Sequence, residues 1–282
     1  PVFQRGYVWT LEKQVVPLWA DVADRANALM ERRTLSPGPG AQALRPLPRH
    51  FLGSNVLAPL TNSFGRVGAY EVIDGQQRTT TLHLLLLALR HATQQLENSP
   101  LPQMLDVLVR NPGPYPNHPD DHHKVWPTQA GRQEMRILDE AQSAEAVCEA
   151  YPVKVEKKVD GKKKEEKVER PLMIQAYLYL YHACLAYLRG IDLADPVNVA
   201  SERTFSDGLV SSTRNANVVQ PVLPDLDLQV ERAETLYTTL NENIQLMTLS
   251  LDAEDDPQVI FETLNARGEP LLASDLIRNL VF

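Results

Sequence analysis

Five consecutive residues, Asp74-Gly75-Gln76-Gln77-Arg78, stand between an apolar segment and a leucine-rich one, and together they could do phosphate chemistry. If a strand enters this turn and a helix leaves it, the first amide N–H groups of the helix point at whatever lies in front. Such a position favours an anion such as phosphate. Gly75 would permit a sharp turn and a close ligand, and Arg78 would add a fork of donors suited to phosphate oxygens.

The remaining side chains of the turn suit the same kind of ligand. Asp74 could hold Mg²⁺ or a ribose hydroxyl, or activate a water molecule. Gln76 or Gln77 could orient a water molecule or read the edge of a base. The structural alternative is a tight turn with solvated glutamines, and the P-loop pattern is absent from the chain. Because both flanking segments are strongly apolar, a row of polar groups here favours a functional site.

The segments around the turn must position these groups. Residues 51–58 and 66–73 have the pattern of two strands joined as a hairpin, and the second, apolar on both faces, should be well buried. Leucines between 82 and 89 cover nearly the whole circumference of the next segment, which predicts a central helix. Other helices are expected at 11–33 (with a kink or late start at Pro17), 129–150, 172–190, 225–243, 256–268 and 274–282, and strands at 124–128 and 244–251.

These elements predict an α+β fold with a small sheet and a largely helical remainder. Residues 1–282 are interpreted as one domain with a helix-rich middle, about 91–243. The stretch 153–171 is almost entirely charged, which is typical of a solvated hairpin tip or a flexible insertion.

Composition narrows the class of protein. A 43% hydrophobic share is enough for a core, and a formal net charge of -8 argues against a surface coated in basic charge, although a local basic groove remains open. Cys148 and Cys184 form no CxxC pair, so reduced thiols and a cytoplasmic location are expected. No apolar run approaches membrane-spanning length. The first residue, Pro1, and a final helical pattern that stops abruptly suggest a piece of a longer protein.

Three motifs in order carry a family resemblance. They are "PVFQRGYVW" at the start, "DGQQR" with its Thr- and Leu-rich continuation, and "VIFETLNARGEPLLASDLIRNLVF" at the end. Together they resemble the N-terminal domain of GmrSD-type modification-dependent restriction enzymes and related SspE-type phage-defence proteins, a domain similar to the ParB/sulfiredoxin-like fold. The motifs span the first 90 residues and about the last 27, and Arg278 stands where the family often has lysine.

The resemblance implies hydrolysis of a nucleoside triphosphate, GTP or another, with Mg²⁺. It also implies a regulatory or sensor role toward DNA, in particular modified DNA, and a nuclease domain in the same chain or a partner chain that the present sequence lacks. A homo-oligomer is compatible with this role. By resemblance the catalytic residues are Asp74, Gln76, Gln77 and Arg78, and the nucleotide-binding residues are Gly75, Arg78, Gln4, Arg5, Asn265, Arg267 and Asp275.

Two further groups of side chains have both a functional and a structural interpretation. Phe3, Tyr7 and Trp9 could stack on bases and sense DNA modification, or could anchor the N-terminal segment in the core. A loop with His118, Asp120, Asp121, His122 and His123 could bind a metal ion, but a Pro-rich loop of this composition is more often an exposed polar tip. No firm metal site is assigned, although Asp74 could hold Mg²⁺.

Three other functions stay open on the sequence. The same pocket could read modified DNA without hydrolysing a nucleotide, an acidic metal site including Asp74 could nick DNA, or the turn could be purely structural. No histidine follows His182 and no lysine follows Lys167. An HNH-type or lysine-bearing nuclease site therefore cannot lie in the last hundred residues.

Overall fold

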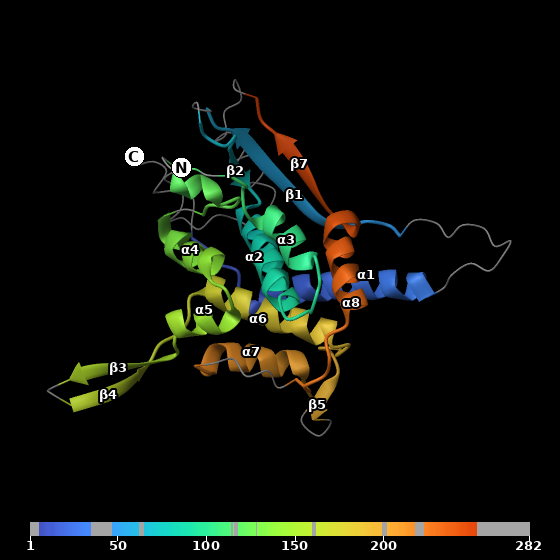
Figure 1. The fold of residues 1–282 in the computed structure, drawn as a ribbon. Coiled ribbons are helices and arrows are strands. Elements are labelled where there is room, and N and C mark those ends of the chain that lie inside the picture. The colour runs from blue at the N-terminus through green and yellow to red at the C-terminus, as the bar shows by residue number, and fades with distance from the viewer. Residues whose placement is uncertain are drawn as a thin grey trace.

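A three-stranded sheet lies at one end of a helical body, in a computed structural model that describes residues 6–34, 47–61, 65–113, 115, 118–127, 129–159, 162–198, 202–217 and 223–252 (Figure 1). The strands are β1 (His50–Pro59), β2 (Tyr70–Asp74) and β7 (Ile244–Ser250), in the order β2-β1-β7. β1 pairs antiparallel with β2 and parallel with β7. The predicted α+β class with a small sheet is confirmed.

The predicted hairpin is present, but its second strand differs from the prediction. β2 begins at Tyr70 rather than at residue 66, and it is not well buried: Tyr70 is 59% exposed, and Ile73 is its one buried residue. The reason is topological, because β2 lies at the edge of the described sheet and packs one side chain into a small cluster with Val56 and Leu251. The apolar residues on both faces of β2 therefore did not indicate a buried, central strand.

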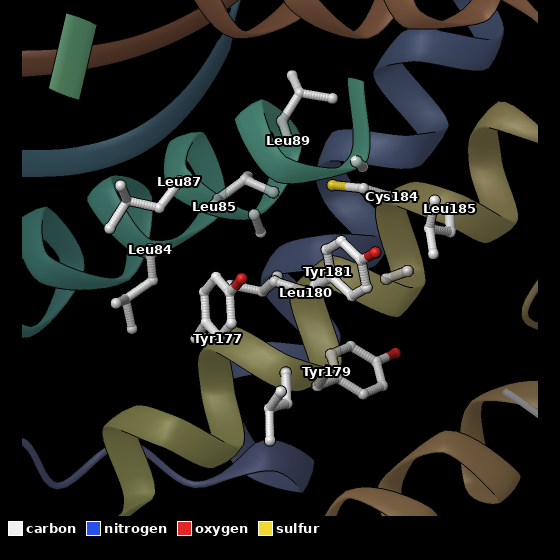
Figure 2. Close-up of a cluster of buried hydrophobic side chains, with 14 of the residues drawn as sticks. Leu84, Leu85, Leu87, Leu89, Tyr177, Tyr179, Leu180, Tyr181, Cys184 and Leu185 are labelled. Atoms are coloured by element: carbon white, nitrogen blue, oxygen red, sulfur yellow. The ribbon is translucent and has the colours of Figure 1, made fainter. Parts of the chain in front are cut away.

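Two helices form the centre of the body, α2 (Gln76–Thr93) and α6 (Leu172–Leu188). In α2 the leucines at 84, 85, 87 and 89 have no exposed surface, and in α6 every residue from Met173 to Leu188 is buried. Figure 2 shows these leucines on different sides of α2, with Leu84 toward the tyrosines of α6 and Leu89 pointing away from them. A helix that is apolar on all sides is stable only when other elements surround it, so the prediction of a central helix after the turn is confirmed.

The first predicted helix is also confirmed, with a modified start. A π-helical turn, η1 (Leu11–Val15), leads into α1 (Val16–Thr34), and Pro17 occupies the second position of α1. Pro17 thus follows a turn that is already helical, and its missing N–H leaves one intrahelical hydrogen bond unmade where the π-helical turn passes into α1. Leu11, Val15 and Trp19 enter the main core.

The middle of the chain is only partly as predicted. Residues 124–127 form no strand, and Pro127 could not donate a ladder hydrogen bond there. The helix expected at 129–150 is interrupted at 141–143. The remaining elements are α3 (Leu101–Val109), η2 (Pro119–His122), η3 (Gln129–Gly131), α4 (Arg132–Glu140), α5 (Ala144–Ala150), β5 (Pro196–Asn198), β6 (Arg203–Thr204), α7 (Phe205–Asn215), α8 (Val230–Thr238) and η5 (Thr239–Asn243).

The charged stretch at 153–171 is a hairpin, as one of the two interpretations predicted. Its strands, β3 (Lys154–Val159) and β4 (Lys162–Lys167), pair with each other and project away from the body (Figure 1). Within the described ranges no helix is both long and apolar enough to cross a membrane. The helices expected at 256–268 and 274–282 lie outside the described residues.

Candidate functional site

The turn at residues 74–78 joins β2 to α2 and requires glycine at its centre. Gly75 has a φ of 91°, in the left-handed region that side chains disfavour. A Cβ atom at this position would lie 2.1 Å from Oδ1 of Asn55 and 3.2 Å from the carbonyl oxygen of Ser54. Glycine therefore lets the chain reverse and lets the start of α2 approach β1 closely.

The first turn of α2 offers backbone donors to a ligand. The first intrahelical bond runs from the amide of Thr79 to the carbonyl oxygen of Gly75, at 2.9 Å. The amides of Gln76, Gln77 and Arg78 precede that bond and point ahead of the helix, where the helix dipole favours negative charge.

A large cleft lies beside this first turn, with a volume of about 1260 Å³. One wall consists of the β1–β2 hairpin and the start of α2, and the opposite wall consists of residues from 120 to 132. Arg66 in the hairpin loop binds Asp121 through two hydrogen bonds of 2.8 and 2.6 Å, which joins the two walls. Lys124 and Arg132 on the far wall add positive charge. The cleft is thus large enough for a nucleotide-sized ligand, and its lining carries charges of both signs, since Glu71, Asp120 and Asp121 line it as well.

Asn55 presents an unsatisfied amide at the point where β1 meets α2. Its side chain lines the cleft, is 7% exposed, and donates from Nδ2 to Oγ1 of Thr79 at 2.9 Å, while Oδ1 has no hydrogen-bond partner in the described part of the chain. A buried, unpaired amide group is costly unless a ligand or water satisfies it. Because the hydroxyl of Thr79 can also donate, the amide can turn over and present its NH₂ group to an anion.

The glutamines of the turn have different roles. Gln76 lines the cleft and donates from Nε2 to the carbonyl oxygen of Val72 at 2.7 Å. Gln77 uses both ends of its amide on the N-terminal segment, accepting from the amide of Val8 at 2.8 Å and donating to the carbonyl oxygen of Gly6 at 3.0 Å. Both glutamines line the cleft, and Gln77 in addition positions the opening motif.

Asp74, Gly75 and Arg78 are absent from the lining of the cleft and lie on the adjoining side of the turn. Arg78 donates from Nη1 to the carbonyl oxygen of Ser54 at 2.7 Å, and its guanidinium lies close over Gly53. The half-buried carboxylate of Asp74 makes no hydrogen bond or ion pair with another described residue. The five motif residues thus form two neighbouring surfaces rather than one.

The opening motif and the DGQQR turn, far apart in sequence, lie together in space. Besides the contacts of Gln77, the hydroxyl of Tyr7 is 2.8 Å from Oγ1 of Thr81. Burial raises the pKa of Tyr7 well above its usual range, so the phenol stays neutral. Tyr7 lines the cleft and Trp9 is half-buried. Phe3, Gln4, Arg5, Asn265, Arg267 and Asp275 lie outside the described residues.

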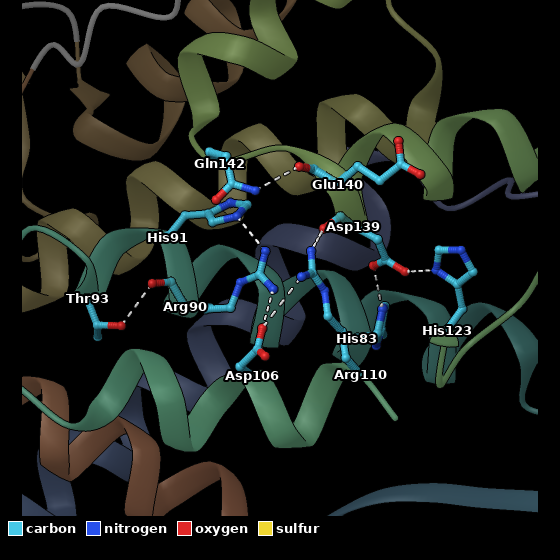
Figure 3. A network of polar contacts seen from close by, with 10 residues as sticks. All are labelled: His83, Arg90, His91, Thr93, Asp106, Arg110, His123, Asp139, Glu140 and Gln142. Atoms are coloured by element: carbon cyan, nitrogen blue, oxygen red, sulfur yellow. Dashed lines mark hydrogen bonds and ion pairs between the residues drawn. The ribbon is translucent and has the colours of Figure 1, made fainter. Parts of the chain in front are cut away.

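A second polar cluster was not predicted from the sequence. Asp139 in α4 lies between His83 of α2 and His123 of the far wall (Figure 3). Within the described ranges no group of three or more metal-binding side chains is found. Instead Asp121 pairs with Arg66, and Asp120 lies 3.5 Å from Arg136. No sequence spacing connects His83, His123 and Asp139, whereas Asn55 is recognisable as a polar residue in an apolar strand.

Comparison with known proteins gives one family. The chain matches the family described as "GmrSD restriction endonuclease, N-terminal domain" over residues 1–282. No curated protein matches the chain, and no solved structure does either, so the likeness to the ParB/sulfiredoxin-like fold stays a prediction. Because the match spans every residue, and the opening motif docks on the DGQQR helix, the chain belongs to the family of GmrSD restriction endonuclease N-terminal domains.

Proposed function

We propose that this domain binds and hydrolyses a nucleoside triphosphate, GTP or another, in the cleft beside the first turn of α2. The unsatisfied amide of Asn55 carries the proposal. It is buried, it lines the cleft, and it lies against the turn whose backbone amides favour an anion. A phosphate group at this place would satisfy the amide of Asn55 and the three free amides together.

Each of the polar side chains has a role in this proposal. The amides of Gln76–Arg78 and the turned-over amide of Asn55 hold phosphate oxygens. Arg78 keeps guanidinium N–H groups beyond its bond to Ser54, and these reach the phosphates from the adjoining side. Gln76 uses only Nε2 within the described chain, so its Oε1 orients the attacking water molecule.

Mg²⁺ is expected to arrive with the nucleotide. Mg²⁺ in nucleotide sites is bound mainly by phosphate oxygens and water, with one or two carboxylates from the protein. The carboxylate of Asp74 fits as the one protein ligand, because it is half-buried beside the turn and uncommitted within the described residues. The cation would neutralise the phosphate charge.

Membership of a restriction family implies DNA as the target of the whole protein. We propose that this DNA is modified and that Tyr7 and Trp9, with Phe3, contribute to sensing the modification. The nucleotide state would then regulate a nuclease domain in the same chain or a partner chain. A cytoplasmic location and a homo-oligomer belong to the same proposal.

An aspartate at position 55 tests the phosphate site directly. Asn55→Asp keeps the size of the side chain and allows Thr79 to donate to it, so the fold should persist, but a negative charge now faces the phosphate. Nucleotide affinity, measured by equilibrium binding with Mg²⁺ and a non-hydrolysable triphosphate, should fall at least about tenfold, roughly 1.4 kcal/mol. The control is Asn98→Asp, which makes the same charge change on an exposed residue beyond the opposite end of α2.

Phosphate release by the purified chain, with and without Asp74→Ala, separates hydrolysis from the alternatives. Wild-type turnover that the substitution abolishes supports the proposal. Binding of modified DNA without turnover of any nucleotide would instead favour a non-hydrolysing sensor. Relaxation of a supercoiled plasmid in Mg²⁺ or Mn²⁺ would favour a nicking domain. If Asn55→Asp leaves nucleotide affinity unchanged, the phosphate does not bind at this turn.

A further inference from the structure

A buried carboxylate between two histidines lies behind the far wall of the cleft. Asp139 is 1% exposed, and its Oδ1 is 3.2 Å from Nε2 of His83. Its Oδ2 makes a short hydrogen bond with Nδ1 of His123, and Arg110 donates to its backbone carbonyl oxygen. Figure 3 shows the carboxylate reaching both rings. α2, α4 and the loop after η2 are therefore connected through one side chain.

Asp139 is charged in the folded protein. Burial by itself would raise the pKa of Asp139, but the hydrogen bonds from His123 and His83 outweigh burial and lower the pKa to about 2. A fixed carboxylate of this kind holds an imidazole in one tautomer, with the proton on the nitrogen that faces the carboxylate. For His123 that nitrogen is Nδ1, which leaves Nε2 as a proton acceptor.

The ring of His123 is held in place from a second direction. It stacks on Trp126 with the ring centroids 4.2 Å apart and the planes 14° from parallel. The side chain is 7% exposed and lines the cleft, and its Nε2 has no hydrogen-bond partner in the described part of the chain. His83 touches the same carboxylate but is absent from the lining of the cleft. Of the two histidines, only His123 can meet a ligand there.

We propose that His123 is the proton acceptor of the hydrolysis, with Asp139 as its positioning residue; this assignment rests on the function proposed above. Water attacks the terminal phosphorus, and a new P–O bond forms while the bond to the bridging oxygen breaks. The bridging oxygen keeps the electron pair and leaves with the nucleoside diphosphate. Nε2 of His123 takes the proton of the water, the carboxylate of Asp139 stabilises the resulting imidazolium, and the proton then passes to solvent.

A purely structural role predicts a different pattern of defects. If the Asp139–His123 bond only joined two segments, its loss would lower the free energy of unfolding and would reduce binding and turnover together. A proton acceptor affects kcat and leaves nucleotide affinity nearly intact, because its interaction forms in the transition state. Lys124 and Arg132 on the same wall remain available for ground-state binding.

The test measures phosphate release and equilibrium nucleotide binding for wild type, His123→Ala, Asp139→Asn and His122→Asn. His123→Ala should lower kcat roughly 10²–10⁴-fold, with affinity within about threefold of wild type. It leaves a ring-sized gap between Asp139 and Trp126, so added imidazole should restore part of the rate. Asp139→Asn should also lower kcat, and added imidazole should not restore the rate. His122→Asn, in the adjacent loop position and outside the cleft lining, should be unchanged.

The outcomes separate this assignment from the function on which it rests. Wild-type turnover that survives in a folded His123→Ala, or a loss that imidazole does not restore while binding falls equally, would overturn the role of His123 and leave hydrolysis standing. A wild-type chain that releases no phosphate from any nucleoside triphosphate would overturn both. Circular dichroism confirms that each variant is folded before its rate is interpreted.

Discussion

The substitution Gly75→Ala should destabilise the protein through two separate effects. The left-handed backbone at a φ of 91° costs a non-glycine residue about 1–2 kcal/mol. The new methyl group would also lie 2.1 Å from Oδ1 of Asn55, so that side chain must move and give up its hydrogen bond to Thr79. The loss of that bond adds about 0.5–1.5 kcal/mol. The free energy of unfolding should fall by about 1.5–3.5 kcal/mol in total.

Gly65→Ala is the matched control for the backbone effect. Gly65 has a φ of 81°, and a Cβ atom there would meet nothing within 4 Å. Its cost should therefore be the backbone cost alone, about 1–2 kcal/mol. Urea unfolding of both variants, with the slope checked for constancy, gives the difference. The double substitution Gly75→Ala and Asn55→Ala should cost less than the sum of the single ones, because the methyl group then occupies vacated space.

Equal destabilisation in Gly75→Ala and Gly65→Ala would show that a methyl group at residue 75 does not clash with Asn55. Strict additivity in the double variant would show the same, since additivity means that residues 75 and 55 do not interact. Either result would mean that the start of α2 is farther from β1 than the 2.1 Å between a Cβ atom at residue 75 and Oδ1 of Asn55 implies.

Two further predictions concern the N-terminal segment and the core. Gln77→Leu removes both side-chain hydrogen bonds to Gly6 and Val8, so amide hydrogen exchange at residues 6–10 should accelerate about tenfold or more. Exchange in α6 should stay slow. Unchanged exchange at residues 6–10 would mean that Gln77 does not hold the N-terminal segment in place. In His182, burial and then Arg189 lower the pKa to about 4. The neutral ring contributes stability above its unfolded pKa of about 6.5, and that stability is lost as pH falls toward 4. His182→Leu should therefore flatten the decline of unfolding free energy over this window by up to about 3 kcal/mol, and an unaltered pH profile would argue against a buried neutral histidine.

Local patterns predicted the elements around the turn because those elements follow from short-range chemistry. The leucines of α2 and the apolar length of α6 specify buried helices, and Gly190, with a φ of 75°, follows the last turn of α6. The hairpin was predictable from two apolar runs around a polar loop. The position of β2 at the sheet edge was not, because the parallel pairing of β1 with β7 joins segments nearly two hundred residues apart in the chain.

In the candidate site, too, the local features were predictable from the sequence and the long-range contacts were not. Gly75 and the glutamines were identified from the sequence, because turn and helix start are local features. It was not predictable that Gln76 would bond to Val72 and Gln77 to the N-terminal segment, because these contacts depend on where residues 6–8 pack. His123 and Asp139 meet only after α4 packs against the loop that carries the histidine, so no spacing signalled their pairing.

A crystal structure with a non-hydrolysable nucleoside triphosphate and Mg²⁺ would show whether the phosphates bind at the turn between β2 and α2. Phosphate density is expected within hydrogen-bonding distance of the amides of Gln76–Arg78 and of the side-chain amide of Asn55, with the terminal phosphate facing His123. A nucleotide bound elsewhere, or a cleft that stays empty at saturating nucleotide, would contradict this expectation.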